Sequence, residues 1–330
     1  MTNIKDLKIN LEQKILSSNK VVLVPHNGVD FDAIASSIGI SQIVSKLGKK
    51  SVIVVDDPVY KIDHGVQQIM NEVNKQSSAN IINRDKYMQM KHPDDLFVLS
   101  DVNKSYLISL KNELIKDNTI IIDHHDEDDN TVEASFKYID TNVSSASEIV
   151  SKLLCMFKIK PSSELANYLL SGIYLDTNKL TKNISTDTMK IVAKLLSHGA
   201  DMNRVTDLFV QDFKSDRRVQ DLVSKAEILS YSIATVLADN NMEYTKEELA
   251  KVADYLLNYG VDASFAIGNI GDGIVSISAR SKEKVNVGEV MKLLGGGGNR
   301  HSAATKLPDT TIEEAGKRLK MVIQTPCYMK

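Results

Sequence analysis

The stretch Val21-Val-Leu-Val-Pro-His26-Asn-Gly-Val-Asp30-Phe-Asp32 joins a short apolar run to a group of polar side chains. Four consecutive aliphatic residues without polar alternation are typical of a strand that is buried on both faces of a sheet. Such strands belong mainly to parallel sheets, because the helices that connect parallel strands cover the sheet. We therefore expect residues 21–24 to form a central strand, with the polar residues just beyond its carboxyl end.

The pattern repeats along the first 200 residues. Apolar, β-branched runs occur at residues 51–55, 97–100 and 119–122, and amphipathic stretches separate them. Residues 34–47 and 147–157 have the spacing of two covering helices, and residues 6–17 have helical spacing as well. Short apolar strands that alternate with helices predict an α/β fold with a doubly wound parallel sheet.

The second part of the chain has a different pattern. Residues 201–230 are charged with little strand character, which predicts a helical linker region. A smaller α/β domain is predicted to follow, with a strand at residues 231–238 and a hairpin made by residues 263–267 and 273–279. Thr245-Lys-Glu-Glu248 is a capping box that begins a helix. Further helices are predicted at residues 287–294 and 311–323.

Composition excludes several classes of protein. The 330 residues carry a net charge of −3, whereas proteins that grip long nucleic acid usually present a basic face. No signal peptide and no apolar run of the ~18 residues that a membrane span requires is found. The two cysteines, Cys155 and Cys327, form no CxxC pattern. We expect a cytoplasmic protein that binds neither membrane nor long nucleic acid, and a homodimer is left open.

Metal-binding side chains follow three of the predicted strands. They are His26, Asp30 and Asp32 after the first, Asp101 after the third, and Asp123, His124 and His125 after the fourth. Asp176 ends the stretch Ser171-Gly-Ile-Tyr-Leu-Asp, which fits either a strand or a helix end. Ligands of open α/β sheets bind beyond the carboxyl ends of the strands, so we expect these side chains to converge.

The residue types indicate a metal. So many carboxylates and imidazoles carry too much like charge to gather unless cations lie between them. Mixed oxygen and nitrogen donors suit Mn²⁺, with Mg²⁺, Co²⁺ and Fe²⁺ as alternatives, whereas metals that prefer thiolates are disfavoured. The sequence therefore predicts a Mn²⁺-type site at this edge of the sheet.

A tract of four glycines, residues 295–298, is the main feature of the second part. Four glycines are too costly in chain entropy for a helix interior. The tract is either a flexible loop or a backbone N–H cradle for a phosphate or a base. Between residues 280 and 306, six basic residues stand against two acidic ones, which suits an anionic ligand. The predicted substrate contacts are Arg280, Gly296, Gly297, Gly298, Asn299, Arg300 and His301.

Taken in order, these motifs resemble those of a known family. His26-Asn-Gly-Val-Asp30-Phe-Asp32-Ala33, the lone Asp101, Asp123-His124-His125 and Asp176 are similar to the four motifs of the DHH phosphoesterase superfamily. The glycines with Ala303-Ala304 resemble the glycine loop of its C-terminal associated domain. The resemblance covers most of the chain. It implies a catalytic, metal-binding domain over residues 1–200 and a substrate-binding domain over residues 231–330, with the linker at residues 201–230 between them.

The resemblance also implies roles for the side chains. One metal ion would be bound by His26, Asp30 and Asp101, and a second by Asp32, Asp101, His124 and Asp176. Asp123 would orient a neighbouring imidazole, and His125 would face the substrate phosphate and protonate the leaving oxygen. Two metal ions would then favour in-line attack of a hydroxide on phosphorus. The chain departs from the family pattern where Asn299 replaces the histidine that usually follows the glycines, and His301 comes two residues later.

Three further stretches indicate a substrate class. Residues 171–179, His198-Gly-Ala-Asp201 and Ser-Ala-Arg-Ser at residues 278–281 are most similar to the catalytic module of cyclic-di-AMP phosphodiesterases. The similarity implies hydrolysis of cyclic di-AMP to pApA, and from there to AMP. One alternative is a nanoRNase of short RNA with 3′-phosphoadenosine-5′-phosphate (pAp) phosphatase activity. An alternative of another class is a non-catalytic nucleotide-binding sensor. Each of these proteins binds a small nucleotide.

Overall fold

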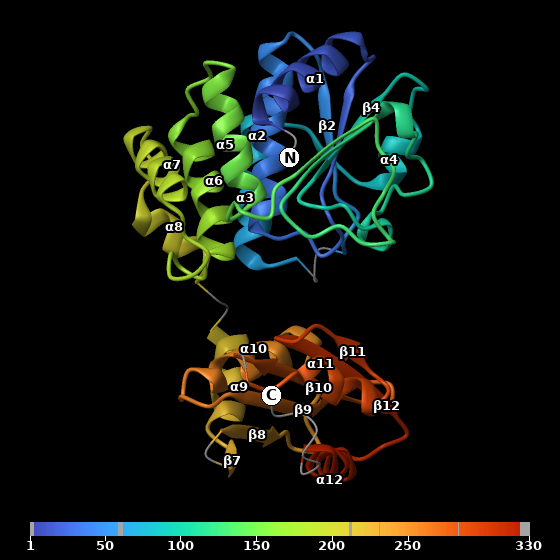
Figure 1. The fold of residues 1–330 in the computed structure, drawn as a ribbon, viewed down its shortest axis with the longest axis vertical. Coiled ribbons are helices and arrows are strands. Elements are labelled where there is room, and N and C mark those ends of the chain that lie inside the picture. Colours follow the sequence, from blue (N-terminus) through green and yellow to red (C-terminus); the bar gives the residue numbers. More distant parts are fainter. Residues whose placement is uncertain (1–2, 59–61, 211–212, 231, 283, 324–330) are drawn as a thin grey trace. The chain divides into compact units, whose positions relative to one another are not determined.

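The computed structural model describes residues 3–58, 62–210, 213–230, 232–282 and 284–323, in two compact units, Met1–Val210 and Gln211–Lys330 (Figure 1). Cys327 and the first residue of the predicted strand 231–238 lie outside the described residues. No helix within the described ranges is long and apolar enough to cross a membrane.

The first unit is built on a six-stranded parallel sheet with the strand order β3-β2-β1-β4-β5-β6. The strands are β1 (Val21–Val24), β2 (Ser51–Val54), β3 (Ile81–Ile82), β4 (Leu96–Ser100), β5 (Thr119–Asp123) and β6 (Phe136–Ile139). The chain winds outward from β1 to β3, returns to β4 on the other side of β1, and continues to β6. This is the predicted doubly wound arrangement, and its topological switch point lies between β1 and β4.

Most helices of this unit contribute to the core on one face of the sheet, where α2 and α5 stand beside the strands in Figure 1. They are α1 (Ile4–Ser17), α2 (Phe31–Lys46), α3 (His64–Gln76), α5 (Ala146–Met156), α6 (Ser163–Asp176), α7 (Thr186–Ser197) and α8 (Met202–Leu208). The other face is covered by α4 (Arg84–Met88) and by irregular segments that include η2 (Ser105–Leu107) and η3 (Lys116–Asn118). Both faces of β1 are apolar because Leu23 packs in the first core and Val24 in the second.

The second unit contains a mixed six-stranded sheet with the order β11-β12-β10-β9-β8-β7. Its strands are β7 (Glu227–Ser230), β8 (Ile233–Leu237), β9 (Ala263–Asn269), β10 (Ile274–Ser281), β11 (Gly297–Gly298) and β12 (Ser302–Pro308), and its helices are α9 (Phe213–Val223), α10 (Lys246–Leu257), α11 (Val287–Leu293) and α12 (Ile312–Ile323). The predicted hairpin is confirmed, since β9 and β10 pair antiparallel. The predicted capping box is also present, with Thr245 and Glu248 each bonded to the other's backbone N–H.

The chain divides differently from the prediction of a separate linker over residues 201–230. Val205 and Leu208 of α8 are buried in the core of the first unit. In the second unit, Val219 and Leu222 of α9 are buried, and β7 pairs antiparallel with β8. Charged, helical spacing predicts that a segment is a helix, but it carries no information on which core the apolar face of that helix joins.

Candidate metal centre

The loop after β1 carries His26 and Asp30. Asp30 is the N-cap of α2, because its Oδ1 accepts hydrogen bonds from the backbone N–H groups of Asp32 (2.9 Å) and Ala33 (3.0 Å). Its other oxygen, Oδ2, lies 3.5 Å from Nε2 of His26. Oδ1 of Asp30 therefore caps the helix, and Oδ2 faces the candidate metal site.

Asp57 holds this loop from a neighbouring strand end, although the sequence analysis did not select it. Its two carboxylate oxygens accept hydrogen bonds from the N–H groups of Gly28 (2.8 Å) and Val29 (3.1 Å). Gly28 has a φ of +74°, which a residue with a side chain would rarely adopt. Asp101 follows β4 directly, whereas Asp57 comes three residues after the end of β2, behind Val55 and Asp56. A search for carboxylates within three residues of every strand end would have found it.

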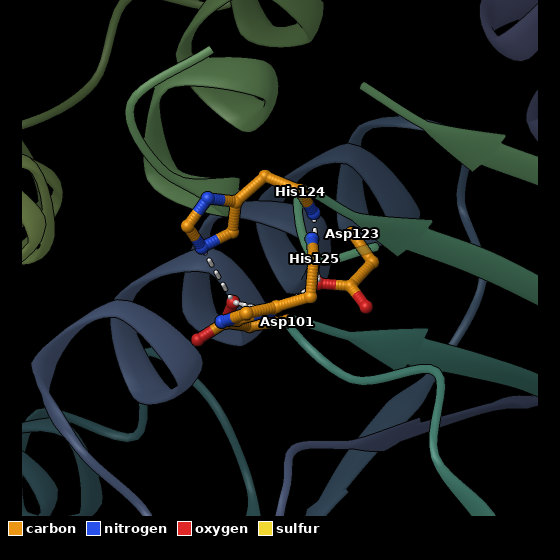
Figure 2. Close-up of side chains that lie close together, drawn as sticks. All are labelled: Asp101, Asp123, His124 and His125. Atoms are coloured by element: carbon orange, nitrogen blue, oxygen red, sulfur yellow. Dashed lines mark hydrogen bonds and ion pairs between the residues drawn. The ribbon is translucent and has the colours of Figure 1, made fainter. Parts of the chain in front are cut away.

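Asp101 lies at the end of β4, beside the switch point, and is 3% exposed. Its φ of +62° is uncommon for a residue with a side chain, and backbone strain of this kind tends to persist at functional sites. The two carboxylate oxygens face different histidines. Oδ2 lies 3.6 Å from Nε2 of His26. Oδ1 lies 3.3 Å from Nε2 of His124, the contact drawn in Figure 2. Asp101 is thus the central carboxylate of the cluster.

Asp123 fixes the two histidines that follow it. Its Oδ1 accepts hydrogen bonds from the backbone N–H groups of His124 (2.8 Å) and His125 (3.3 Å) and lies 2.8 Å from Nδ1 of the His125 ring. Figure 2 shows the His125 ring beside this carboxylate, while the His124 ring points toward Asp101. Asn103 adds a second restraint, since its side-chain Nδ2 donates to the carbonyl of His125 at 3.0 Å.

The remaining two carboxylates approach from helices. Asp176 is the last residue of α6, so the helix-end alternative is the right one, and its Oδ2 lies 3.2 Å from Nε2 of His124. Asp32 is fully buried, and its oxygens accept hydrogen bonds from the N–H groups of Ala146 (2.7 Å) and Ser147 (2.8 Å) at the start of α5. Its Oδ2 is also 3.9 Å from Nε2 of His124.

Glycine at position 172 permits this close packing of Asp32 between helices. A Cβ at Gly172 would lie 2.3 Å from Oγ of Ser147 and 2.6 Å from Oδ1 of Asp32. Any side chain would therefore push α6 away from the carboxylate, and Asp176 with it.

The protonation equilibria of the cluster reflect its crowding. Burial lowers the pKa of His26, but its contacts with Asp101 and Asp30 outweigh this effect and raise the pKa to about 11. Burial acts on His124 in the same way, and contacts with Asp101 and Asp176 raise its pKa to about 11. Burial together with the charges of Asp101 and Asp176 raises the pKa of Asp32 well above its ordinary value. The carboxylates thus create a strong demand for positive charge at this place.

The residues fit divalent cations. Three sets of donor atoms each lie within 4.8 Å of one another: Asp101, Asp123, His124 and His125; His26, Asp30 and Asp101; and Asp32, His124 and Asp176. Oδ1 of Asp101 and Nε2 of His124 are buried and form no hydrogen bond with the described residues, and their contacts include an ion pair with one another at 3.3 Å and one between His124 and Asp176 at 3.2 Å. Buried polar atoms without hydrogen bonds are costly unless another group satisfies them. Carboxylate and imidazole donors without thiolate suit Mn²⁺ and similar ions.

The glycine tract of the second unit is an ordered edge of the sheet, because β11 pairs with β12. A Cβ at Gly296 would lie 2.2 Å from the carbonyl oxygen of Ala304, and one at Gly298 would lie 2.4 Å from Cα of Ala303. A Cβ at Gly297 would meet nothing within 4 Å. Packing therefore requires glycine at 296 and 298, but it does not explain glycine at 297.

The polar residues predicted to contact substrate are largely engaged in local structure. Nε of Arg280 donates to Oδ1 of Asp254 at 2.9 Å. Oδ1 of Asn299 accepts hydrogen bonds from the N–H groups of His301 (2.9 Å) and Ser302 (2.8 Å), and Nδ1 of His301 contacts the carbonyl of Lys282. Asn299 thus shapes the turn into β12, which accounts for an asparagine at this position. Arg300 is exposed beside it.

Two family models match the chain. The DHH family, N-terminal domain, matches residues 20–173, and the DHHA1 domain matches residues 230–325. The first match contains every predicted metal ligand except Asp176. The second contains the glycine tract and all predicted substrate contacts.

Individual proteins are similar over nearly the whole chain. The cyclic-di-AMP phosphodiesterase GdpP of Geobacillus thermodenitrificans is 34% identical over 95% of this chain and 48% of its own length. The cyclic-di-AMP phosphodiesterase PdeA of Listeria monocytogenes is 31% identical over 94% of this chain and 48% of its own length. The chain therefore spans about half the length of these relatives.

A solved structure has the same fold. The crystal structure of an exopolyphosphatase-related protein from Bacteroides fragilis aligns with a TM-score of 0.80 at 21% identity, over 98% of both chains. The chain thus carries a DHH N-terminal domain followed by a DHHA1 domain, and it belongs to the DHH family.

Proposed function

We propose that the protein is a Mn²⁺-dependent phosphodiesterase that hydrolyses cyclic di-AMP to pApA. The observation that carries this proposal is the convergence of carboxylates and histidines from strand ends and helix ends around Asp101 and His124, whose facing atoms are buried, form no hydrogen bond with the described residues and lie in ion pairs. In this proposal one ion is held by His26, Asp30 and Asp101, and another by Asp32, Asp101, His124 and Asp176. Bound divalent cations would supply an activated water molecule and neutralise the charge of the phosphate.

His125 is suited to donate a proton to the leaving oxygen. Its contact with Asp123 raises the pKa of the ring, and this effect outweighs the opposing effect of burial. Because Asp123 lies at Nδ1, the other ring nitrogen is available to the substrate. The side chain is 55% exposed, whereas Asp123 behind it is fully buried. This arrangement supports a role for Asp123 as the residue that orients the donor.

The assignment of cyclic di-AMP as the substrate is supported by the relatives. Two proteins named cyclic-di-AMP phosphodiesterases align with 95% and 94% of the chain. The second unit would supply the substrate contacts Arg280, Gly296, Gly297, Gly298, Asn299, Arg300 and His301. Gly297 supports this role, because its backbone is open to a ligand and no neighbouring residue accounts for the absence of a side chain.

A product assay tests the proposal. Cyclic di-AMP, pApA and pAp are offered separately, with Mn²⁺, to the wild type, to Asp101→Asn and to Asp129→Asn, whose exposed carboxylate is the matched control. We expect pApA to form from cyclic di-AMP in the wild type and in Asp129→Asn. The rate should fall on the order of 1,000-fold in Asp101→Asn, because a central carboxylate is lost.

Other outcomes of this assay have distinct meanings. Consumption of pApA or pAp alone would replace the proposed substrate with a short nucleotide. Full activity of Asp101→Asn would refute the metal assignment. No turnover of any nucleotide by the wild type would refute the proposed function.

A further inference from the structure

A cavity of about 640 Å³ opens beside the metal centre of the first unit. His124, His125 and Asp176 form one side of it, and two loops, residues 141–144 and 183–185, form the walls. We propose that this cavity, here called the side cavity, binds a nucleoside of the substrate, with its base and ribose between the two loops. The proposal rests on the proposed function, because it names the part of the nucleotide that adjoins the metal centre.

The walls of the side cavity are polar but uncharged. Apart from the two histidines, no residue found to line it is cationic, and Asp126 and Asp176 are acidic. The loops contribute hydroxyl and amide groups together with the aliphatic surfaces of Val143 and Ile184, of which Ile184 is 38% exposed. A chain of phosphates would find no cationic side chain on these two loops, whereas a base and a ribose find hydrogen-bonding groups and apolar contact.

Two helices, α5 and α7, begin at these loops, and free N–H groups at their starts would favour an anion. In α5, however, the N–H groups of Ala146 and Ser147 donate to Asp32. The next N–H group, of Glu148, donates to Oγ of Ser145 at 3.1 Å. The carboxyl groups of Asp32 and Glu148 already accept hydrogen bonds at this helix start, so it offers little to a phosphate.

Glu148 also ties the two walls together. Its Oε2 accepts hydrogen bonds from Oγ of Ser144 at 2.7 Å and from Oγ1 of Thr188 at 2.8 Å. Thr188 forms a capping box with Ser185, and the side-chain oxygens of these two residues lie 2.9 Å apart. Ser144 belongs to one wall and Ser185 to the other, so a buried carboxylate holds both loops at a fixed separation. A cavity held in this way is formed before a ligand arrives.

The wall at residues 183–185 follows a strained turn. Asn178, Lys179 and Leu180 have φ values of 46°, 63° and 58°, which residues with side chains rarely adopt in succession. The fully buried Thr177 stabilises the turn, because its Oγ1 accepts the N–H of Leu180 at 3.0 Å. Strain of this kind persists where surrounding contacts compensate for it. The turn directs the chain from Asp176 back to the cavity at Asn183.

Two asparagines are placed to recognise the nucleoside. Asn183 has a φ of 53°, is exposed, and makes no side-chain hydrogen bond with the described residues. Asn142, on the opposite wall, is exposed, and its backbone N–H (3.1 Å) and its side-chain Nδ2 (3.3 Å) both donate to Oδ1 of Asp140. Amide side chains pair well with base edges, because they carry a donor and an acceptor side by side. Asn142 and Asn183 are therefore the specificity-determining residues of this proposal.

The test compares substrates with and without a nucleoside. The double variant Asn142→Ala/Asn183→Ala and the wild type are assayed with Mn²⁺ on cyclic di-AMP and on bis(p-nitrophenyl) phosphate. Asn71→Ala, an exposed asparagine of α3, is the matched control. The preference for cyclic di-AMP, expressed as the ratio of the two kcat/KM values, should fall about tenfold in the double variant, because two hydrogen bonds are lost. The ratio should not change in Asn71→Ala.

An unchanged ratio in the double variant would overturn the proposal. An equal loss on both substrates would also overturn it, since it would mean that the loops support the metal centre rather than the nucleoside.

A binding measurement, which does not depend on turnover, tests this proposal separately from the proposed function. The affinities of AMP and of inorganic phosphate are measured by calorimetry with Mn²⁺ present. We expect the double variant to bind AMP about tenfold more weakly and phosphate equally well. If the wild type does not hydrolyse cyclic di-AMP, the proposed function fails, and weakened AMP binding still supports the nucleoside cavity. Equal AMP binding, or a parallel loss of phosphate binding, would refute it.

Discussion

The metal centre of the first unit and the glycine tract of the second unit satisfy their polar groups in different ways. In the candidate metal centre, Oδ1 of Asp101 and Nε2 of His124 are buried, form no hydrogen bond with the described residues, and contact one another as an ion pair at 3.3 Å. Among the predicted substrate contacts around the glycine tract, Arg280 is paired with Asp254, and Asn299 accepts hydrogen bonds from its own turn. Buried polar groups that form no hydrogen bond indicate a place for a ligand, whereas polar groups that are hydrogen-bonded within the protein have a structural role. In the first site the groups left to bind a ligand are therefore side chains, and in the second they are chiefly backbone groups.

The largest effect should come from the backbone of the glycine tract. Gly298→Ala places a Cβ 2.4 Å from Cα of Ala303 at a φ of 143°, so we expect the free energy of unfolding to fall by about 2–4 kcal/mol. Gly297→Ala meets no neighbour and should change the free energy of unfolding by less than about 0.5 kcal/mol. Urea denaturation of both variants measures the difference. Equal losses would mean that steric packing does not distinguish the two glycines.

A smaller effect is expected from the residue that supports the β1 loop. Asp57→Ala removes the acceptor of the Gly28 and Val29 N–H groups, which leaves His26 and Asp30 less firmly placed. We expect Mn²⁺ affinity to fall about 10- to 100-fold, as for other residues that orient metal ligands. Calorimetric titration with Mn²⁺ measures this. The neighbouring Asp56→Ala, which loses a contact with the Arg84 N–H instead, is the control. Equal affinity in all three proteins would show that the site needs no such support.

The smallest expected effect is the pH dependence of the free energy of unfolding that results from the ionisation of Glu148. Burial raises the pKa of this carboxyl, but hydrogen bonds from Lys152, Ser144 and Thr188 outweigh it, and the pKa lies below the ordinary 4.5. Its stabilisation is therefore complete above about pH 4.5 and is lost as the pH falls through the lowered pKa. Glu148→Gln should be less stable by about 1 kcal/mol at pH 7, because glutamine keeps part of the hydrogen bonding.

The difference in the free energy of unfolding between the wild type and Glu148→Gln should become smaller at pH values below the lowered pKa of Glu148. Chemical denaturation at pH 7 and at successively lower pH values measures it. A gap of constant size over the whole range would contradict the role of the ionised carboxylate.

The candidate metal ligands were largely predictable from the sequence because the relevant pattern is local. A short apolar run followed at once by a carboxylate or histidine places that side chain at the carboxyl edge of a parallel sheet. Asp101 follows such a run directly, and His26 and His124 each come two residues after one. The structure brings all three together. The edge strands were not predicted, because β3 has two residues and β6 is mostly half-buried, so neither forms a distinct apolar run.

What the sequence by itself determined is the identity of the strand-end side chains and their demand for cations, since both depend on residue type and on spacing over a few positions. Only the tertiary structure decided which groups meet across long separations. Asp32 bonds to the start of α5 more than 100 residues later. Asp57 supports the β1 loop, and Asn299 turns inward to its own backbone. These contacts depend on how whole elements pack, and packing is set by apolar surfaces that many sequences could supply.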